Sequence, residues 1–161
     1  MPATTSMKVN TALGTLHLRL SGQASLQAPW MFCWPSLLMD GRMWQAQATH
    51  FGSRYRVVCI DPPGAGESAP LTRHFTLEEC ALVLRQLLDA LGAPDCVLLG
   101  NSWGGMMGGV FAALYPERLR AAVLMNGTAS SVGWVQQLEF LALAALVQRS
   151  ARFPPALGSR A

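Results

Sequence analysis

The chain has 161 residues, which is the length of one domain with a single buried core. Hydrophobic residues make up 51% of it and charged residues only 13%, a composition typical of a parallel sheet covered on both faces. The net charge of +3 comes from scattered basic residues, and no apolar run reaches the ~20 residues that span a bilayer, so we expect neither a nucleic-acid partner nor a membrane partner.

Strands and helices alternate along the first half of the chain. Residues 15–20 alternate polar and apolar side chains, which predicts a half-exposed edge strand. Residues 30–34 are a short apolar run, which predicts a buried strand. Residues 43–49 predict a short helix, and residues 55–60 predict a strand rich in β-branched side chains. A turn-rich segment, residues 61–66, closes this last strand.

The second half begins with the clearest helix in the chain. Thr76 and Glu79 have the spacing of a capping box, and Gly92 is a typical helix end. Residues 96–99 then predict a buried strand that leads into a helix ending near Tyr115, and residues 119–125 predict a further strand. After a last apolar helix over residues 134–149, the alternation predicts a doubly wound, mostly parallel sheet.

The segment between strand 96–99 and the following helix has the G-x-S-x-G pattern of a nucleophile elbow, Gly100-Asn101-Ser102-Trp103-Gly104. A serine held on so sharp a turn needs neighbours without bulk, and glycine on both sides removes the Cβ clashes. Its hydroxyl then projects above the sheet at the positive end of a helix, where developing negative charge is stabilised. The alternative is a glycine-rich turn with an incidental serine, but the strand before it and the helix after it favour a nucleophile.

Further motifs make the chain resemble the α/β-hydrolase family. Residues 61–68 (DPPGAGES) are similar to the family's D-x-P-G-x-G-x-S loop, and residues 115–119 (YPERL) to its Y-P-E-R-V stretch. Residues 35–44 (PSLLMDGRMW) and 126–129 (NGTA) are similar to the branch containing 3-oxoadipate enol-lactonases. The resemblance implies an α/β fold.

In that fold, residues 1–131 would be the N-terminal part of a hydrolase core lacking its last strands. Residues 132–161 would be the start of a helical cap and an irregular tail.

The resemblance also implies a mechanism. Ser102 would be the nucleophile of an acyl-enzyme on ester or lactone bonds, with the backbone N–H groups of Trp103 and Leu37 as oxyanion donors. Pro35 stands where the family usually has His or Asn and lacks an N–H, but that position is not an expected donor. No cofactor or metal is implied.

The predicted substrate is a small, largely apolar molecule. Trp34, Ser36 and Trp134 are the expected substrate contacts, whereas we interpret Leu38 and Met106 as core packing. A serine nucleophile disfavours the dehalogenases and epoxide hydrolases, which resemble this fold but place Asp at the elbow.

A serine nucleophile also needs a base, and in this fold the acid and then the histidine follow it in sequence. The chain has three histidines, all before Ser102: His17, His50 and His74. The acids after Ser102 are Glu117, which we expect to pair with Arg118 or Arg120, and Glu139. Two hypotheses therefore stay open: a serine hydrolase, or a truncated, catalytically inactive fragment or pseudoenzyme that acts as a binding module.

Location and assembly follow from two further patterns. The four cysteines lack metal-ligand or C-x-x-C spacing and lie in expected strands and helices, so we expect free buried thiols and a cytoplasmic location: Cys33, Cys59, Cys80 and Cys96. If the sheet lacks its last strands, the strand at residues 119–125 exposes an unpaired edge, which predicts self-association.

Overall fold

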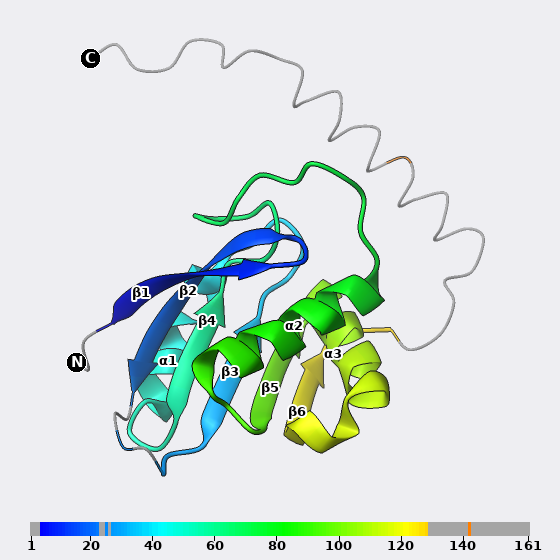
Figure 1. Ribbon diagram of the computed structural model, residues 1–161. Helices are drawn as coiled ribbons and strands as arrows, with labels where there is room; N and C mark the ends of the chain where they lie inside the picture. The colour runs from blue at the N-terminus through cyan, green and yellow to red at the C-terminus, as the bar shows by residue number, and fades with distance from the viewer. Residues whose placement is uncertain (1–3, 23–24, 26, 129–141, 143–161) are drawn as a thin grey trace, which may run out of the picture. The chain divides into compact units, whose positions relative to one another are not determined.

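The described part of the chain is built around one mostly parallel sheet (Figure 1). The computed structural model describes residues 4–22, 25, 27–128 and 142, and all of these except Ala142 belong to one unit. Its elements follow in chain order: β1 (Thr5–Thr11), β2 (Gly14–Gly22), β3 (Trp30–Trp34), the 3₁₀ helix η1 (Gly41–Trp44), α1 (Gln45–Phe51), β4 (Arg56–Ile60), α2 (Leu77–Leu91), β5 (Cys96–Asn101), α3 (Trp103–Leu114), the 3₁₀ helix η2 (Pro116–Arg118) and β6 (Leu119–Met125).

The strands are arranged in the order β1-β2-β4-β3-β5-β6. β1 and β2 form an antiparallel hairpin, and β2 pairs with β4 antiparallel, whereas the pairs β4–β3, β3–β5 and β5–β6 are all parallel. The predicted fold class, a doubly wound and mostly parallel sheet, is therefore confirmed.

Helices cover the sheet on both faces because successive side chains of a strand point to opposite sides. On one face, α2 and α3 pack over a large core that contains Phe32, Trp34 and Leu98. On the other face, η1 and α1 pack over a smaller core that contains Met31 and Cys33. Figure 1 shows α1 and α2 on opposite sides of the sheet. The buried strands read as apolar runs for this reason, since both of their faces are covered.

The N-terminal hairpin differs from the sequence prediction. β1 was not predicted, and it pairs along the outer side of β2. The predicted edge strand at residues 15–20 is therefore wrong in its position, because β2 lies between β1 and β4. Leu16, His17 and Leu18 are all buried in consequence. A polar histidine between two leucines gives the appearance of a half-exposed strand, although its ring is buried too.

The local signals of the second half are confirmed. Thr76 and Glu79 form the reciprocal capping box of α2, and Gly92 ends that helix in a left-handed conformation with φ 64°.

The predicted pairing of Glu117 is wrong, because Arg118 pairs with Asp89 at 2.7 Å and Arg120 with Asp95 at 3.1 Å.

β6 has the predicted bounds and forms one edge of the described sheet. The side chains of Val123 and Leu124 are 49% and 40% exposed. Apart from Ala142, the predicted cap lies outside the described residues. None of the helices in the described ranges combines the length and the apolar character that a membrane crossing needs.

Candidate active site

Ser102 lies at a sharp corner between β5 and α3. Its backbone has φ 53° and ψ −116°, a combination that residues with a side chain rarely adopt and that costs about 1–3 kcal/mol. The Ser102 N–H donates to the Met125 carbonyl at 2.8 Å. The Ser102 carbonyl accepts a hydrogen bond from the Met106 N–H, in the first turn of α3, at 3.0 Å. The side chain is half-buried, so it is neither within the helix nor sealed in the core. The predicted strand-to-helix corner is thus present.

The two glycines of the motif are required by close backbone contacts. A Cβ on Gly100 would overlap the carbonyl of Gly104. A Cβ on Gly104 would overlap the carbonyl oxygen of Trp34 and come within 2.8 Å of the carbonyl oxygen of Pro35. The G-x-S-x-G pattern therefore lets β5 turn into α3 and lets α3 lie directly against the loop that follows β3.

That loop carries the second predicted oxyanion donor. β3 and β5 are neighbours, and Trp34 lies opposite Gly100 in their register, so the loop after Trp34 begins beside the elbow. The backbone N–H of Trp103 lies at the N-terminus of α3, where helix N–H groups have no partner within the helix and the helix dipole favours negative charge. Leu37 is in the loop with its side chain 61% exposed. The roles of both N–H groups stay predictions.

Three polar side chains are hydrogen-bonded to one another at the carboxyl ends of the strands beside the elbow. Asn101, the residue before Ser102, donates from Nδ2 to Ser36 Oγ at 2.8 Å. Its Oδ1 accepts a hydrogen bond from Asn126 Nδ2, also at 2.8 Å. Ser36, predicted as a substrate contact, thus uses its hydroxyl oxygen as an acceptor within the protein. Neither Asn101 nor Asn126 was predicted as a site residue, and no local pattern marks their pairing because they are far apart in sequence.

The tryptophans near the elbow have different environments. Trp34 has no exposed surface and packs in the large core, so we assign it to packing rather than to substrate contact. Trp103 is half-buried, with its ring 5.8 Å from that of Trp34 and 5.9 Å from that of Phe75. Trp134, the third predicted substrate contact, lies outside the described residues.

The predicted core role of two apolar residues is wrong. Leu38 is 79% exposed and Met106 is 37% exposed. Leu38 has a left-handed backbone, with φ 64°, in the loop after β3. Met106 lies on the outer side of the first turn of α3. Leu37, Leu38 and Met39 together make the loop beside the elbow an exposed apolar surface.

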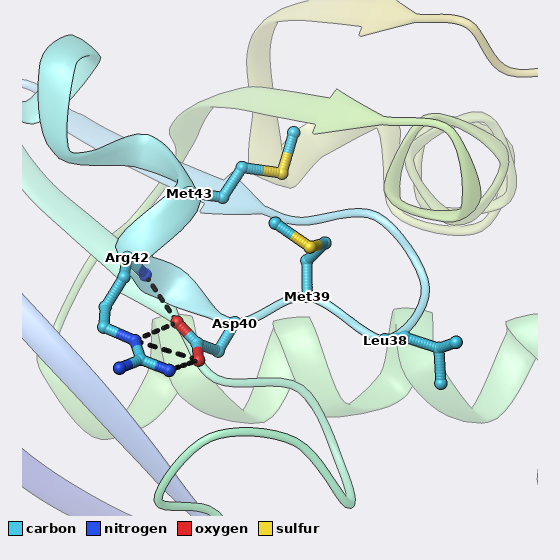
Figure 2. Close-up of a pocket in the computed structure, with 5 residues that line it drawn as sticks. All are labelled: Leu38, Met39, Asp40, Arg42 and Met43. Carbon is cyan, nitrogen blue, oxygen red and sulfur yellow. Dashed lines mark hydrogen bonds and ion pairs between the residues drawn. The ribbon is translucent and has the colours of Figure 1, made fainter. Parts of the chain in front are cut away.

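An open hollow of about 360 Å³ lies along the same loop (Figure 2). Its lining is Leu38, Met39, Asp40, Arg42 and Met43. Figure 2 shows the two methionine side chains on one side and the Asp40–Arg42 ion pair on the other. Hydrogen bonds from the Arg42 guanidinium lower the pKa of Asp40 to about 2, so its carboxylate stays charged at neutral pH.

The D-P-P-G-A-G-E-S loop has a structural role that starts at Asp61. This carboxylate is fully buried at the end of β4 and accepts from His17 Nδ1 at 2.9 Å and from the Arg19 guanidinium. It also accepts from the N–H groups of Gly41 at 2.8 Å and Glu67 at 2.9 Å. Burial raises the pKa of Asp61, but these hydrogen bonds outweigh it and lower the pKa below its usual value. Asp61 thereby ties its own loop to the end of the β3–η1 loop.

Metal-ligand atoms also meet in this network, since those of His17, Asp61 and Glu67 lie within 4.8 Å of one another. Arg19 pairs with both carboxylates, and a divalent cation would have to displace its charge. We therefore assign the cluster to anchoring the loops.

The histidines are placed as follows. His17 is held by Asp61, and His50 lies edge-on to the ring of Phe51 with centroids 4.8 Å apart. His74 is exposed in the loop before α2. Within the residues that the structure describes, none of the three rings is hydrogen-bonded to Ser102. The general base is therefore not identified among them.

Comparison with known proteins adds a family-level finding. The family described as "alpha/beta hydrolase fold" matches residues 29–154. Human epoxide hydrolase 4 is 39% identical over 85 residues, which are 52% of this chain and 24% of that protein. 3-Oxoadipate enol-lactonase 2 of Acinetobacter baylyi is 33% identical over 94 residues, or 58% of this chain and 35% of that protein.

A solved structure of a hydrolase from Pseudomonas aeruginosa has a TM-score of 0.79 and 30% identity, over 95% of this chain and 61% of that one. The chain spans about a quarter of the length of epoxide hydrolase 4 and about a third of that of the enol-lactonase.

Proposed function

Because this chain belongs to the α/β hydrolase fold family, we propose that it is a hydrolase that cleaves ester or lactone bonds through an acyl-enzyme on Ser102. The observation that carries the proposal is the strained corner at Ser102, with φ 53°, at the N-terminus of α3. Strain of this kind persists only where the surrounding structure enforces it, and it clusters at functional sites. Here, close glycine contacts and the hydrogen bond to Met125 enforce it.

In the proposed reaction, Ser102 Oγ attacks the carbonyl carbon and its proton passes to a base. The carbonyl oxygen becomes an oxyanion that accepts hydrogen bonds from the N–H groups of Trp103 and Leu37. The ester C–O bond then breaks, the leaving oxygen takes up the proton, and the acyl group stays on Ser102 until water releases it. The order of the family's triad assigns the base to a segment after Ser102, and these 161 residues contain no histidine there.

The proposed substrate is small and largely apolar. The support is the surface beside the elbow, where Leu37, Leu38 and Met39 are exposed and a methionine-lined hollow follows the loop. Esterase or lactonase activity also agrees with the name of the 33% identical enol-lactonase. The name of epoxide hydrolase 4 suggests a different reaction, which the test has to include.

The proposed location is the cytoplasm. Cys33, Cys59, Cys80 and Cys96 are all free and buried, as predicted, and unpaired thiols persist in a reducing compartment.

Labelling with a fluorophosphonate tests the nucleophile directly. Oxyanion donors accelerate acyl transfer even when a triad member is missing, so we expect the wild-type chain to be modified at Ser102, mapped by mass spectrometry, faster than an exposed serine. Ser102→Ala should abolish the label, whereas Ser6→Ala removes an exposed β1 hydroxyl and should not change it. The same three chains are then assayed with a p-nitrophenyl ester, a lactone and an epoxide. Absence of label on Ser102 would contradict the hydrolase proposal and favour a binding module, and turnover of the epoxide alone would contradict the ester or lactone assignment.

A further inference from the structure

Three polar residues form a hydrogen-bonded chain across the carboxyl ends of three neighbouring strands. Ser36 follows β3, Asn101 is the last residue of β5, and Asn126 follows β6. The Asn101 amide donates to Ser36 and accepts from Asn126, both at 2.8 Å. Since both ends of the amide are engaged, its orientation is fixed. The residue adjoining Ser102 is therefore bonded to the loops on both of its sides.

The loop after β3 is also held at its far end and by a turn of its own, in which the Met39 N–H donates to the Ser36 carbonyl at 3.1 Å. At its far end, Gly41 N–H is bonded to Asp61 at 2.8 Å. Between these ends, the side chains of Leu37, Leu38 and Met39 are 61%, 79% and 47% exposed, so packing does not immobilise them. Among the side-chain hydrogen bonds of the described residues, the Ser36–Asn101 bond joins the near part of the loop to the elbow, where Gly104 also lies against the carbonyls of Trp34 and Pro35.

Covalent geometry makes this bond relevant to catalysis. The Leu37 N–H belongs to the peptide unit that directly follows Ser36, and Asn101 directly precedes Ser102. A hydrogen bond from Asn101 to Ser36 therefore restrains the peptide unit of the Leu37 N–H relative to the backbone of Ser102. Such preorganisation is the source of oxyanion stabilisation, because the donor must already be in place when charge develops.

We propose that Asn101 is a positioning residue that holds the loop after β3 at the distance from Ser102 at which the Leu37 N–H can stabilise an oxyanion. Asn126 orients the Asn101 amide so that its NH₂ group faces Ser36. The catalytic part of this assignment rests on the proposed function of Ser102. The mechanical part, which is the coupling of Asn101 to the loop, does not depend on it.

Amide hydrogen exchange of the loop tests the mechanical part without any activity. Asn101→Ala and Ser36→Ala should each raise the exchange rate of the Met39 N–H, which donates to the Ser36 carbonyl at 3.1 Å, by about 10-fold, the effect of losing one hydrogen bond. The double variant should exchange no faster than either single variant, because both remove the same bond. Asn101→Asp should restore protection, since its carboxylate can accept from the Ser36 hydroxyl and from Asn126.

The matched control is Asn10→Ala. Asn10 is also hydrogen-bonded through its amide, to the Thr15 hydroxyl at 2.7 Å, but in the β1–β2 hairpin at the opposite edge of the sheet. It should change neither loop exchange nor labelling. Asn126→Ala should raise loop exchange less than Asn101→Ala, because it removes only the group that orients the amide.

Labelling kinetics test the catalytic part. In Asn101→Ala and Ser36→Ala, the maximal rate of fluorophosphonate reaction with Ser102 should fall at least about 10-fold, approaching the ~10²-fold loss of an oxyanion donor. The probe concentration at half-maximal rate should stay within about twofold, since reversible binding is not what the bond controls. A merely destabilised fold would instead change both parameters and the unfolding midpoint.

The outcomes separate the two proposals. Unchanged loop exchange in Asn101→Ala, or additive effects in the double variant, would overturn the positioning role even if Ser102 reacts normally. Raised loop exchange with unchanged labelling would overturn the catalytic part of the proposal. If wild-type Ser102 does not react at all, the proposed function fails, and loop exchange alone decides whether Asn101 holds the loop.

Discussion

Substitution of Gly104 by alanine tests the contact on which the elbow depends. In a helix interior, glycine to alanine stabilises by about 0.5–1 kcal/mol when space allows. At Gly104, however, the new Cβ would overlap the carbonyl oxygen of Trp34 and lie 2.8 Å from that of Pro35. Both are backbone atoms at the end of a buried strand, so they cannot yield as a side chain would.

Overpacking of this kind costs about 1–3 kcal/mol, and relief requires moving α3 away from the loop after β3. We therefore expect Gly104→Ala to be destabilised by about 1–3 kcal/mol in urea unfolding followed by tryptophan fluorescence, and to lose most labelling of Ser102.

Gly109 supplies the matched control for this measurement. It lies in the same helix, and a Cβ there would meet no atom of its described surroundings within 4 Å. Gly109→Ala should therefore gain about 0.5–1 kcal/mol of stability from helix propensity alone and keep the labelling rate. The reasoning would be refuted if Gly104→Ala were as stable as Gly109→Ala, because the close contact between α3 and the loop would then be absent in solution.

Three further perturbations follow from buried groups and the sheet edge. Asp61→Ala leaves the Arg19 charge without its buried partner and should cost about 3–5 kcal/mol at pH 7. Because the pKa of Asp61 is lowered in the folded state, its stabilising contribution is present above the unfolded-state pKa and is lost as pH falls through the folded-state pKa. The difference in unfolding free energy between Asp61→Ala and the wild type, measured in urea, should therefore shrink in acid. A difference that grew in acid would contradict the assignment.

Burial raises the pKa of the Cys80 and Cys96 thiols to about 12, so iodoacetamide at pH 8 should alkylate them only in denaturant, and rapid alkylation of the native chain would refute their burial. If β6 mediates self-association, sedimentation velocity should show concentration-dependent oligomers that Val123→Lys weakens, whereas Lys8→Ala on β1 should leave them unchanged.

Elements encoded by neighbouring residues were predictable from the sequence. The capping box of α2 needs only Thr76 and Glu79, and the end of that helix needs only Gly92 in a left-handed conformation. The corner at Ser102 was predictable for the same reason, since its sharp turn depends on glycines two residues away on either side. The strand–helix alternation then determines a mostly parallel sheet, because right-handed crossovers leave few other arrangements.

The tertiary structure alone decided which side chains face the core and which polar groups meet. Trp34 was a plausible substrate contact and Leu38 a plausible core residue, yet Trp34 is buried and Leu38 is exposed, because the chain leaves the sheet between them. The bond from Asn101 to Ser36 joins residues 65 positions apart and that from His17 to Asp61 residues 44 apart. Such pairings depend on strand order, which brings the ends of distant segments together, and no local periodicity of the sequence predicts them.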